Sequence, residues 1–190
     1  LIETFRYEPQ RGFIRLDRHL ARMQASAETF GFPFDAAHVN EKLQVLADPH
    51  EMMRIRVALT AQGGVKVTHQ PYAALPACTV WRLKIAKNRL DSSDPLLRHK
   101  TSRRQIYEQA RAEFSADEAD EVLLLNERGE LCDGCISNLY LEAPNGALLT
   151  PALDCGLLPG VLRGKMLRNK KASEAVLTLR DAVSAKSVFV

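Results

Sequence analysis

A polar, turn-rich segment from Lys87 to Arg98 constrains the fold of this chain more than any other feature. It contains Asn88 and the run from Asp91 to Pro95. Such segments are typical of domain boundaries, because few contacts cross an exposed polar linker. A chain of 190 residues with 46% apolar residues can bury one large core or two small ones. We therefore expect an α+β chain with a small α/β domain at residues 1–90 and a larger domain at 91–190.

Hydrophobic periodicity predicts the elements of the first half. From Met52 to Thr60 apolar and polar residues alternate, which indicates a half-buried strand. From Asp17 to Phe30 the apolar residues recur at helical spacing, so we predict a helix with Asp17 as its N-cap and Gly31 as its end. Further elements are expected as a helix at 35–46 and strands at 1–7, 13–16, 65–70 and 79–86.

The second half is predicted to hold shorter strands and two helices. Apolar residues at helical spacing favour a helix at 102–114, and Pro159 and Gly160 are typical of the start of another helix, which ends near Leu167. Short strands are expected at 121–125, 138–141 and 147–150, and an apolar run covers 187–190.

Charge and cysteine content exclude several classes of protein. The 26 Lys and Arg are scattered among 23 Asp and Glu, so the net charge of +3 gives no basic block for nucleic acid or an anionic membrane. Cys132 and Cys135 match C-x-x-C, but no second pair completes a zinc set, and we expect no metal. There is no signal-like N-terminus and no apolar run of membrane-spanning length, so we expect a soluble, cytoplasmic protein with a small-molecule substrate.

Lys100 is the strongest candidate for chemistry. It precedes a predicted helix and lies about thirty residues before Asp133 and Gly134, while Gly160 opens a later helix. A lysine amine, a carboxylate and the backbone N–H groups of a helix N-terminus are what pyridoxal phosphate needs for its Schiff base, its pyridinium nitrogen and its phosphate. The alternative for Lys100 is a solvated surface amine.

The order of several motifs resembles the class IV pyridoxal-phosphate aminotransferases, a group that holds branched-chain aminotransferases, D-amino-acid aminotransferases and aminodeoxychorismate lyases. The resemblance covers nearly the whole chain. It rests on the segments Leu1 to Arg6, Asp17 to Met23, His99 to Thr101, Asp133 to Asn138, Thr150 to Pro151 and Leu157 to Arg163. It implies the two-domain fold type IV of D-amino-acid aminotransferases, with pyridoxal 5'-phosphate in the cleft between the domains, and a homodimer.

The resemblance assigns roles to two of these residues. Lys100 matches the lysine that forms the Schiff base and then moves a proton at the substrate's α carbon. Asp133 lies where the family usually has glutamate, whose carboxylate keeps the pyridine nitrogen protonated. Aspartate is one methylene shorter, and a simple turn aspartate before Gly134 is the alternative. Asn138 also matches a family position, and we expect it to be structural.

The resemblance also predicts the residues that hold the phosphate. Arg22 matches the family arginine that contacts this group, although its place off the apolar stripe of its helix also suits a solvated arginine. Pro159 and Gly160 would present the backbone N–H groups of Val161 and Leu162 to the phosphate at a helix N-terminus. Many family members have threonine at the position of Leu162.

Two departures from the family bear on the reaction. Branched-chain enzymes have tyrosine five residues after the lysine, where this chain has Gln105 preceded by Arg104. The segment Val65 to Val67 lacks the Arg-x-His of D-amino-acid enzymes. We expect an aminotransferase that acts on a small amino acid through Lys100. The alternatives are elimination like that of aminodeoxychorismate lyase, favoured by Arg104 and Leu162, or a catalytically impaired homologue that binds pyridoxal phosphate.

Overall fold

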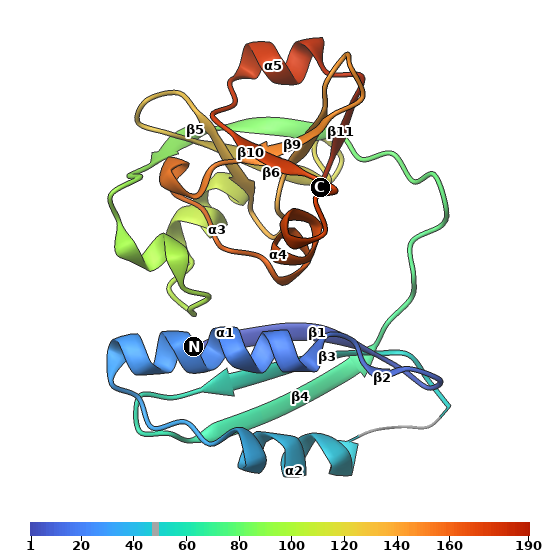
Figure 1. Cartoon of the computed structure of the whole chain (residues 1–190), viewed down its shortest axis with the longest axis vertical. Helices are drawn as coiled ribbons and strands as arrows, with labels where there is room; N and C mark the ends of the chain where they lie inside the picture. The colour runs from blue at the N-terminus through green and yellow to red at the C-terminus, as the bar shows by residue number, and fades with distance from the viewer. Residues whose placement is uncertain (47–49) are drawn as a thin grey trace. The chain divides into compact units, whose positions relative to one another are not determined.

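The computed structural model describes residues 1–46 and 50–190, which form two compact units. One unit comprises Leu1–Thr79 together with Lys100–Ser102, and the other comprises Val80–His99 together with Arg103–Val190. Each unit mixes helices with sheets (Figure 1). No helix in these two stretches of chain has the length and apolar character that a membrane span requires.

The first unit is built on a four-stranded antiparallel sheet in the order β2-β1-β3-β4. Its strands are β1 (Ile2–Glu8), β2 (Gly12–Phe13), β3 (Met53–Leu59) and β4 (Val65–Pro71). In β3 every second side chain is buried, as the alternation in the sequence predicted. The expected strand at 13–16 is shorter than predicted, because α1 already begins at Leu16.

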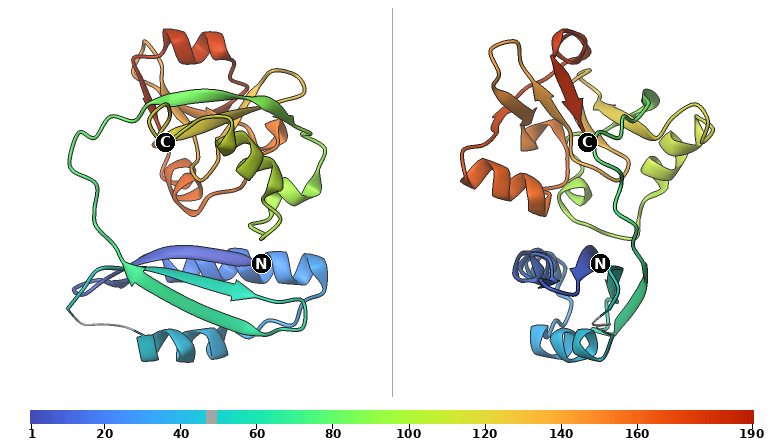
Figure 2. Two further views of the ribbon diagram at one scale, coloured as in Figure 1. Left: turned by 180° about the vertical axis from the view of Figure 1, so that it is seen from behind. Right: turned by 90° about the vertical axis from the view of Figure 1, so that its right-hand side faces the viewer.

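Two helices cover one face of this sheet: α1 (Leu16–Phe30) and α2 (Ala36–Leu46). Both lie on the same side of the strands in Figure 2, and both contribute to one core with the inward residues of β1 and β3. Gly31 ends α1 with φ of 67°, as predicted. The prediction that Asp17 caps α1 is wrong. Arg15, in the left-handed conformation, is the N-cap, and Asp17 lies in the first turn.

The second unit contains two sheets. One has the order β5-β6-β7 and the other β10-β9-β8-β11. The strands are β5 (Leu83–Leu90), β6 (Glu121–Asn126), β7 (Leu131–Gly134), β8 (Tyr140–Glu142), β9 (Leu148–Pro151), β10 (Ser173–Ala175) and β11 (Ser187–Phe189). Every residue of β6 is buried, because its alternate side chains enter two different apolar cores.

The helices of the second unit are α3 (Gln105–Ala112), α4 (Val161–Arg168) and α5 (Leu179–Ser184), with short 3₁₀ helices η1 (Pro95–Arg98) and η2 (Leu153–Cys155). Helix α3 packs against the core that contains Val122 and Leu124 of β6. The other core joins Leu123 and Leu125 of β6 to the strand β8.

The strand β5 differs from its predicted position. It runs from Leu83 to Leu90, whereas the sequence suggested 79–86 and a polar linker from Lys87 onward. Parallel pairing with the fully buried β6 carries the strand into this polar stretch. The strand therefore belongs to the second unit, which begins at Val80 and not at residue 91.

Candidate active site

The segment Lys100–Ser102 belongs to the first unit, although the chain on either side of it belongs to the second. The backbone carbonyl of Lys100 accepts a hydrogen bond from the N–H of Ile2 at 2.8 Å, which attaches the segment to the start of β1. Before it, the side chain of Asp94 accepts a bond from the N–H of Leu96 and so caps η1. The lysine therefore follows a capped 3₁₀ helix, and its own backbone is attached to the start of β1.

Arg22 shares this unit and forms an ion pair with the buried side chain of Glu3. Its Nε and Nη2 donate to the two carboxylate oxygens of Glu3 at 2.8 and 2.7 Å, and the side chain of Glu3 is 1% exposed. The alternative of a solvated arginine is therefore wrong. The phosphate-binding role of Arg22 stays a prediction.

Glu3 was missed by the sequence analysis, although its position gave a signal. It lies in β1 on the same face as Phe5 and Tyr7, so a charged side chain enters the apolar face of the sheet. His19 Nδ1 lies 2.7 Å from Glu3 Oε2, and the centres of the His19 and Phe5 rings are 5.2 Å apart. Burial favours the protonated acid, but the hydrogen bonds from His19 and Arg22 outweigh it and lower the pKa of Glu3.

Asp133 lies in β7 of the second unit and is 4% exposed. Its Oδ1 accepts a hydrogen bond from Asn138 Nδ2 at 2.9 Å, and its Oδ2 accepts one from the N–H of Leu158 at 3.1 Å. Asn138 Nδ2 also donates to the carbonyl oxygen of Leu158 at 3.0 Å. Asp133 is thus a strand residue and not the simple turn aspartate considered as the alternative, and Asn138 has the structural role expected of it.

The contact between Gly160 and Asn138 explains the glycine before α4. A Cβ atom at position 160 would lie 1.6 Å from Asn138 Oδ1, although the backbone angles of Gly160 suit any residue. Glycine is therefore required by close approach and not by backbone conformation. The buried acid and the start of α4 are held together through Asn138 and through the N–H of Leu158.

The start of α4 has the features of an anion site. Gly160 is its N-cap, and no side chain caps the helix. The N–H groups of Val161 and Leu162 lie in the first turn, where a helix has N–H groups without intrahelical acceptors and a positive end of its dipole. The side chain of Leu162 is 49% exposed and offers no hydroxyl.

Tyr140 adds an unsatisfied polar group to this unit. Within the part of the chain that the structure describes, its buried hydroxyl has no hydrogen-bond partner. Burial raises the pKa of this phenol, and the charge of Asp133 adds to the effect, so the group is an O–H donor at neutral pH. A buried acid, a buried donor and an uncapped helix N-terminus fit a small aromatic phosphate such as pyridoxal phosphate.

Arg104 contacts the turn that follows Asp133. Its Nη2 donates to the carbonyl oxygen of Cys135, and its guanidinium lies 4.9 Å from the centre of the Tyr107 ring. Gln105, which stands in place of the family tyrosine, is exposed at the start of α3. The basic residue is therefore the one that lies near the candidate acid.

The C-x-x-C cysteines are poorly suited to thiolate chemistry. Cys132 donates to the carbonyl oxygen of Cys155 at 3.0 Å, and Cys135 donates to that of Tyr107 at 3.3 Å. Burial raises the pKa of Cys135 to about 11 and raises that of Cys132 as well. Within residues 1–46 and 50–190, no three His, Cys, Asp or Glu side chains form a group that could hold a metal.

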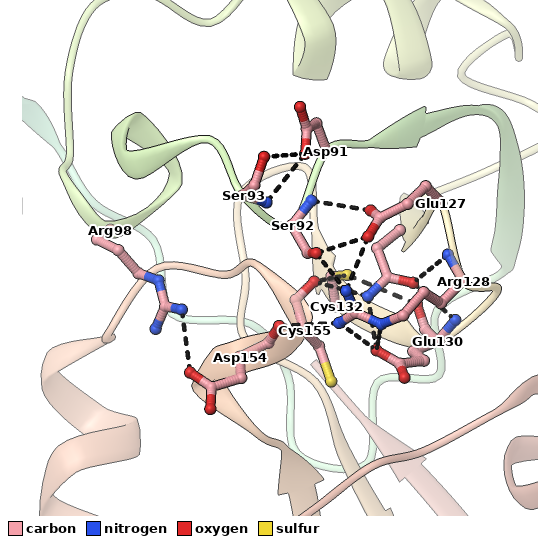
Figure 3. Close-up of polar contacts among 11 residues, drawn as sticks. Asp91, Ser92, Ser93, Arg98, Glu127, Arg128, Glu130, Cys132, Asp154 and Cys155 are labelled. Atoms are coloured by element: carbon pink, nitrogen blue, oxygen red, sulfur yellow. Dashed lines mark hydrogen bonds and ion pairs between the residues drawn. The ribbon is translucent and has the colours of Figure 1, made fainter.

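A polar network holds the segment that leads to the candidate lysine (Figure 3). Glu127 accepts hydrogen bonds from the N–H and the hydroxyl of Ser92 at 2.9 and 2.6 Å, which lowers the pKa of Glu127 to about 2. Arg128 donates to Glu130 at 2.7 Å and to the carbonyl oxygen of Asp154 at 2.9 Å. The network therefore joins the turn after β5 to the β6–β7 turn and to the loop that precedes α4.

Known proteins share both the sequence pattern and the fold. The chain is 49% identical to a proposed amino-acid aminotransferase from Mesorhizobium loti, with a TM-score of 0.96 over 100% of this chain and 92% of that one. A proposed aminodeoxychorismate lyase from Schizosaccharomyces pombe is 29% identical over 92% of this chain and 75% of its own length.

A proposed branched-chain-amino-acid aminotransferase from Thermotoga maritima is 31% identical over 83% of this chain, which spans 58% of that relative. The family model described as Amino-transferase class IV matches residues 1–190. The fold and this match over the whole length show that the chain belongs to the class IV aminotransferase family.

Proposed function

We propose that this protein is a pyridoxal-phosphate-dependent aminotransferase that acts on a small amino acid through Lys100. The observation that carries the proposal is the connection of Asp133, through Asn138 and Leu158, to the start of α4. A buried acid for a ring nitrogen and N–H groups for a phosphate are fixed relative to each other. When bound, the cofactor supplies an electron sink for charge that develops at the substrate's α carbon.

The residues of the chain divide this work. Lys100 would hold the cofactor covalently and then move the proton at the α carbon of the substrate. Arg22, whose guanidinium is oriented by Glu3, would bind the phosphate together with the N–H groups of Val161 and Leu162. A homodimer stays a prediction from the resemblance, and a cytoplasmic location stays a prediction from the sequence alone.

A second candidate reaction is elimination like that of an aminodeoxychorismate lyase. The contact of Arg104 with the carbonyl oxygen of Cys135 favours it, because this places the basic residue of the lyase branch beside the turn after Asp133. The exposed, apolar side chain of Leu162 agrees with the same branch. The two reactions differ in stoichiometry, since transamination consumes a keto acid and elimination needs no acceptor.

Borohydride reduction in the presence of pyridoxal phosphate, followed by peptide mapping, tests the assignment of Lys100. We expect the reduced cofactor on Lys100 and its loss in Lys100→Ala, with thermal unfolding nearly unchanged. Lys165→Ala is the matched control, because this lysine lies in α4 and should leave the labelling intact. Recovery of the label on Lys165 or Lys87 would show that the assignment is wrong.

Turnover with and without an added keto acid separates the two reactions. An aminotransferase should convert amino acids only when a keto acid is present, in equal molar amounts. A lyase should consume aminodeoxychorismate without one. Labelling of Lys100 without either turnover would support the impaired homologue, in which the shorter Asp133 no longer serves the ring nitrogen.

A further inference from the structure

Glu121, the first residue of β6, is a buried carboxylate that the proposed chemistry does not use. Its side chain is 1% exposed. Its Oε1 accepts hydrogen bonds from the N–H groups of Val122 at 2.9 Å and Cys135 at 3.1 Å. Its Oε2 accepts from the N–H of Ile136 at 3.2 Å and the hydroxyl of Ser137 at 2.7 Å. Three of the four donors come from one short turn.

These contacts require a carboxylate. An ionised carboxylate only accepts hydrogen bonds and has about four sites for them, which matches the four donors. A glutamine has one oxygen, and its NH₂ group would face N–H or O–H donors. Burying a charge is costly, so a site that only had to fill space at the start of β6 would be better served by an apolar side chain.

The turn that Glu121 binds connects Asp133 to Asn138, two residues of the candidate site in the second unit. It runs from Gly134 to Ser137, directly after Asp133 and directly before Asn138. The N–H of Gly134 donates to the carbonyl oxygen of Ser137 at 2.9 Å, which closes the turn. Its length and shape therefore set the distance between Asp133 and Asn138, which form a β-bridge.

The packing at Gly134 shows how tightly the carboxylate fits. A Cβ atom at position 134 would lie 2.7 Å from Cδ and Oε2 of Glu121 and 2.5 Å from Oγ of Ser137. There is no room for the turn to move toward β6 while Glu121 keeps its four bonds. Removal of these bonds releases the turn on this side.

We infer that Glu121 is a positioning residue, which acts through the Gly134–Ser137 turn to hold Asp133 and Asn138 in register with the start of α4. The inference rests on the proposed function, in which Asp133 serves the cofactor ring. Glu121 itself does not touch cofactor or substrate. Its effect on the cofactor is transmitted by Asp133.

The test is a double-mutant cycle read by affinity for pyridoxal phosphate, measured by titration of the cofactor's absorbance. Glu121→Gln should weaken the affinity about tenfold, the equivalent of one lost charge-assisted hydrogen bond. In an Asp133→Asn background the same change should weaken the affinity less than about twofold. The effects of two substitutions are not additive when one residue acts through the other. An equal loss in both backgrounds, or no loss in either, would overturn the inference.

Two further variants protect the test against a general loss of structure. Ser137→Ala removes one of the four bonds and should give a smaller loss of affinity in the same direction, even if Glu121→Gln fails to fold. Glu118→Gln is the matched control, since Glu118 also accepts from the N–H and hydroxyl of a serine, Ser115, but lies outside the turn. It should bind the cofactor like the parent.

Amide hydrogen exchange separates failure of the inference from failure of the proposed function. The amides of Cys135 and Ile136 should exchange at least tenfold faster in Glu121→Gln and unchanged in Glu118→Gln, without any cofactor. If the parent protein does not bind pyridoxal phosphate, the proposed function fails, and the inference fails with it. If the parent protein binds pyridoxal phosphate but the losses of affinity in the double-mutant cycle are additive, the proposed function stands and only the positioning role of Glu121 is wrong.

Discussion

Glu3 shows at the scale of one residue how a buried charge is retained in a small sheet. Its carboxylate faces the apolar side of β1 and is stabilised by a two-point contact with Arg22 and by His19. Removal of one partner from such a pair is costly, because the other charge remains buried without compensation. The side chain of Arg22 is only 13% exposed, so solvent screens the pair little.

The stability of the protein should depend on Glu3 at neutral pH and much less in acid. Its pKa is lowered below 4.5 in the folded state, so the folded protein binds fewer protons than the unfolded chain. The stabilisation is complete above the unfolded pKa and is lost as the pH falls through the folded value. Glu3→Gln should lower the free energy of unfolding by about 3–5 kcal/mol at pH 7, and by less at pH 3.

Urea denaturation at the two pH values measures this difference. Glu8→Gln in the same strand is the control, since Glu8 pairs with the more exposed Arg6 and Arg11. Its cost should stay within about 1 kcal/mol. A cost for Glu3→Gln that does not change between pH 7 and pH 3 would contradict the linkage.

At the scale of elements, the N-cap and the interior of α4 each hold a glycine, and substitution of the two should have opposite consequences. Gly160 precedes the helix and lies against Asn138, whereas Gly164 lies inside it. At Gly164 the nearest atom to an added Cβ is the flexible end of Arg168, at 3.2 Å. Only the first glycine is required by its surroundings.

Gly160→Ala should therefore destabilise the protein and weaken cofactor binding, while Gly164→Ala should be tolerated. Overpacking against Asn138 is expected to cost about 1–3 kcal/mol. Alanine inside a helix is favoured over glycine by up to about 1 kcal/mol, so Gly164→Ala should raise the melting temperature slightly. Differential scanning calorimetry and cofactor titration check both expectations.

Asn138→Ala in the Gly160→Ala background provides the rescue. It removes the atom that the new Cβ would meet, at the expense of the bonds to Asp133 and Leu158. Stability should recover in part, and affinity for pyridoxal phosphate should not. If Gly160→Ala alone behaves like Gly164→Ala, the close approach does not constrain this position.

At the scale of the whole molecule, the sequence predicted most elements that have a strong local signal, although helix α5 was missed despite the capping box of Thr178 and Asp181 at its start. The alternation from Met53 to Leu59 gave β3, and Gly31 gave the end of α1. The strand β7 had no such signal, because it is four buried residues held by pairing with β6. The start of β5 was also misplaced, since its bounds depend on a partner strand about forty residues later.

The residues of the candidate site were predicted from a family resemblance and not from local patterns such as periodicity. The choice of Lys100, Asp133 and Arg22 came from the resemblance to a family, and none of these residues stands out by periodicity. Their supporting residues, Glu3 and Glu121, could not be assigned from sequence, because each acts through contacts that only the folded chain brings together. A charged residue on a buried strand face is the signal that both of them share.

Asp133 is the residue on which the reaction of the whole protein depends most. Asp133→Asn should slow exchange of the substrate's α proton with deuterium by about a hundredfold or more, because a neutral amide cannot keep the ring nitrogen protonated. The structure adds a second effect. One end of the asparagine would be an NH₂ group facing either the N–H of Leu158 or the amide of Asn138, so the contact with the start of α4 should weaken too.

Asp133→Glu separates these two effects. It keeps the negative charge and has the side-chain length that is usual in the family, but it displaces the carboxylate from Asn138 and Leu158. Exchange in this variant should stay within about tenfold of the parent, since the acid that serves the ring nitrogen is retained. Cofactor affinity should fall, because the longer side chain can no longer keep both anchoring bonds in place. Deuterium exchange followed by nuclear magnetic resonance reports the proton step whatever reaction follows it. Exchange in Asp133→Asn as fast as in the parent would show that Asp133 only anchors the loop before α4, and another residue would have to serve the ring nitrogen.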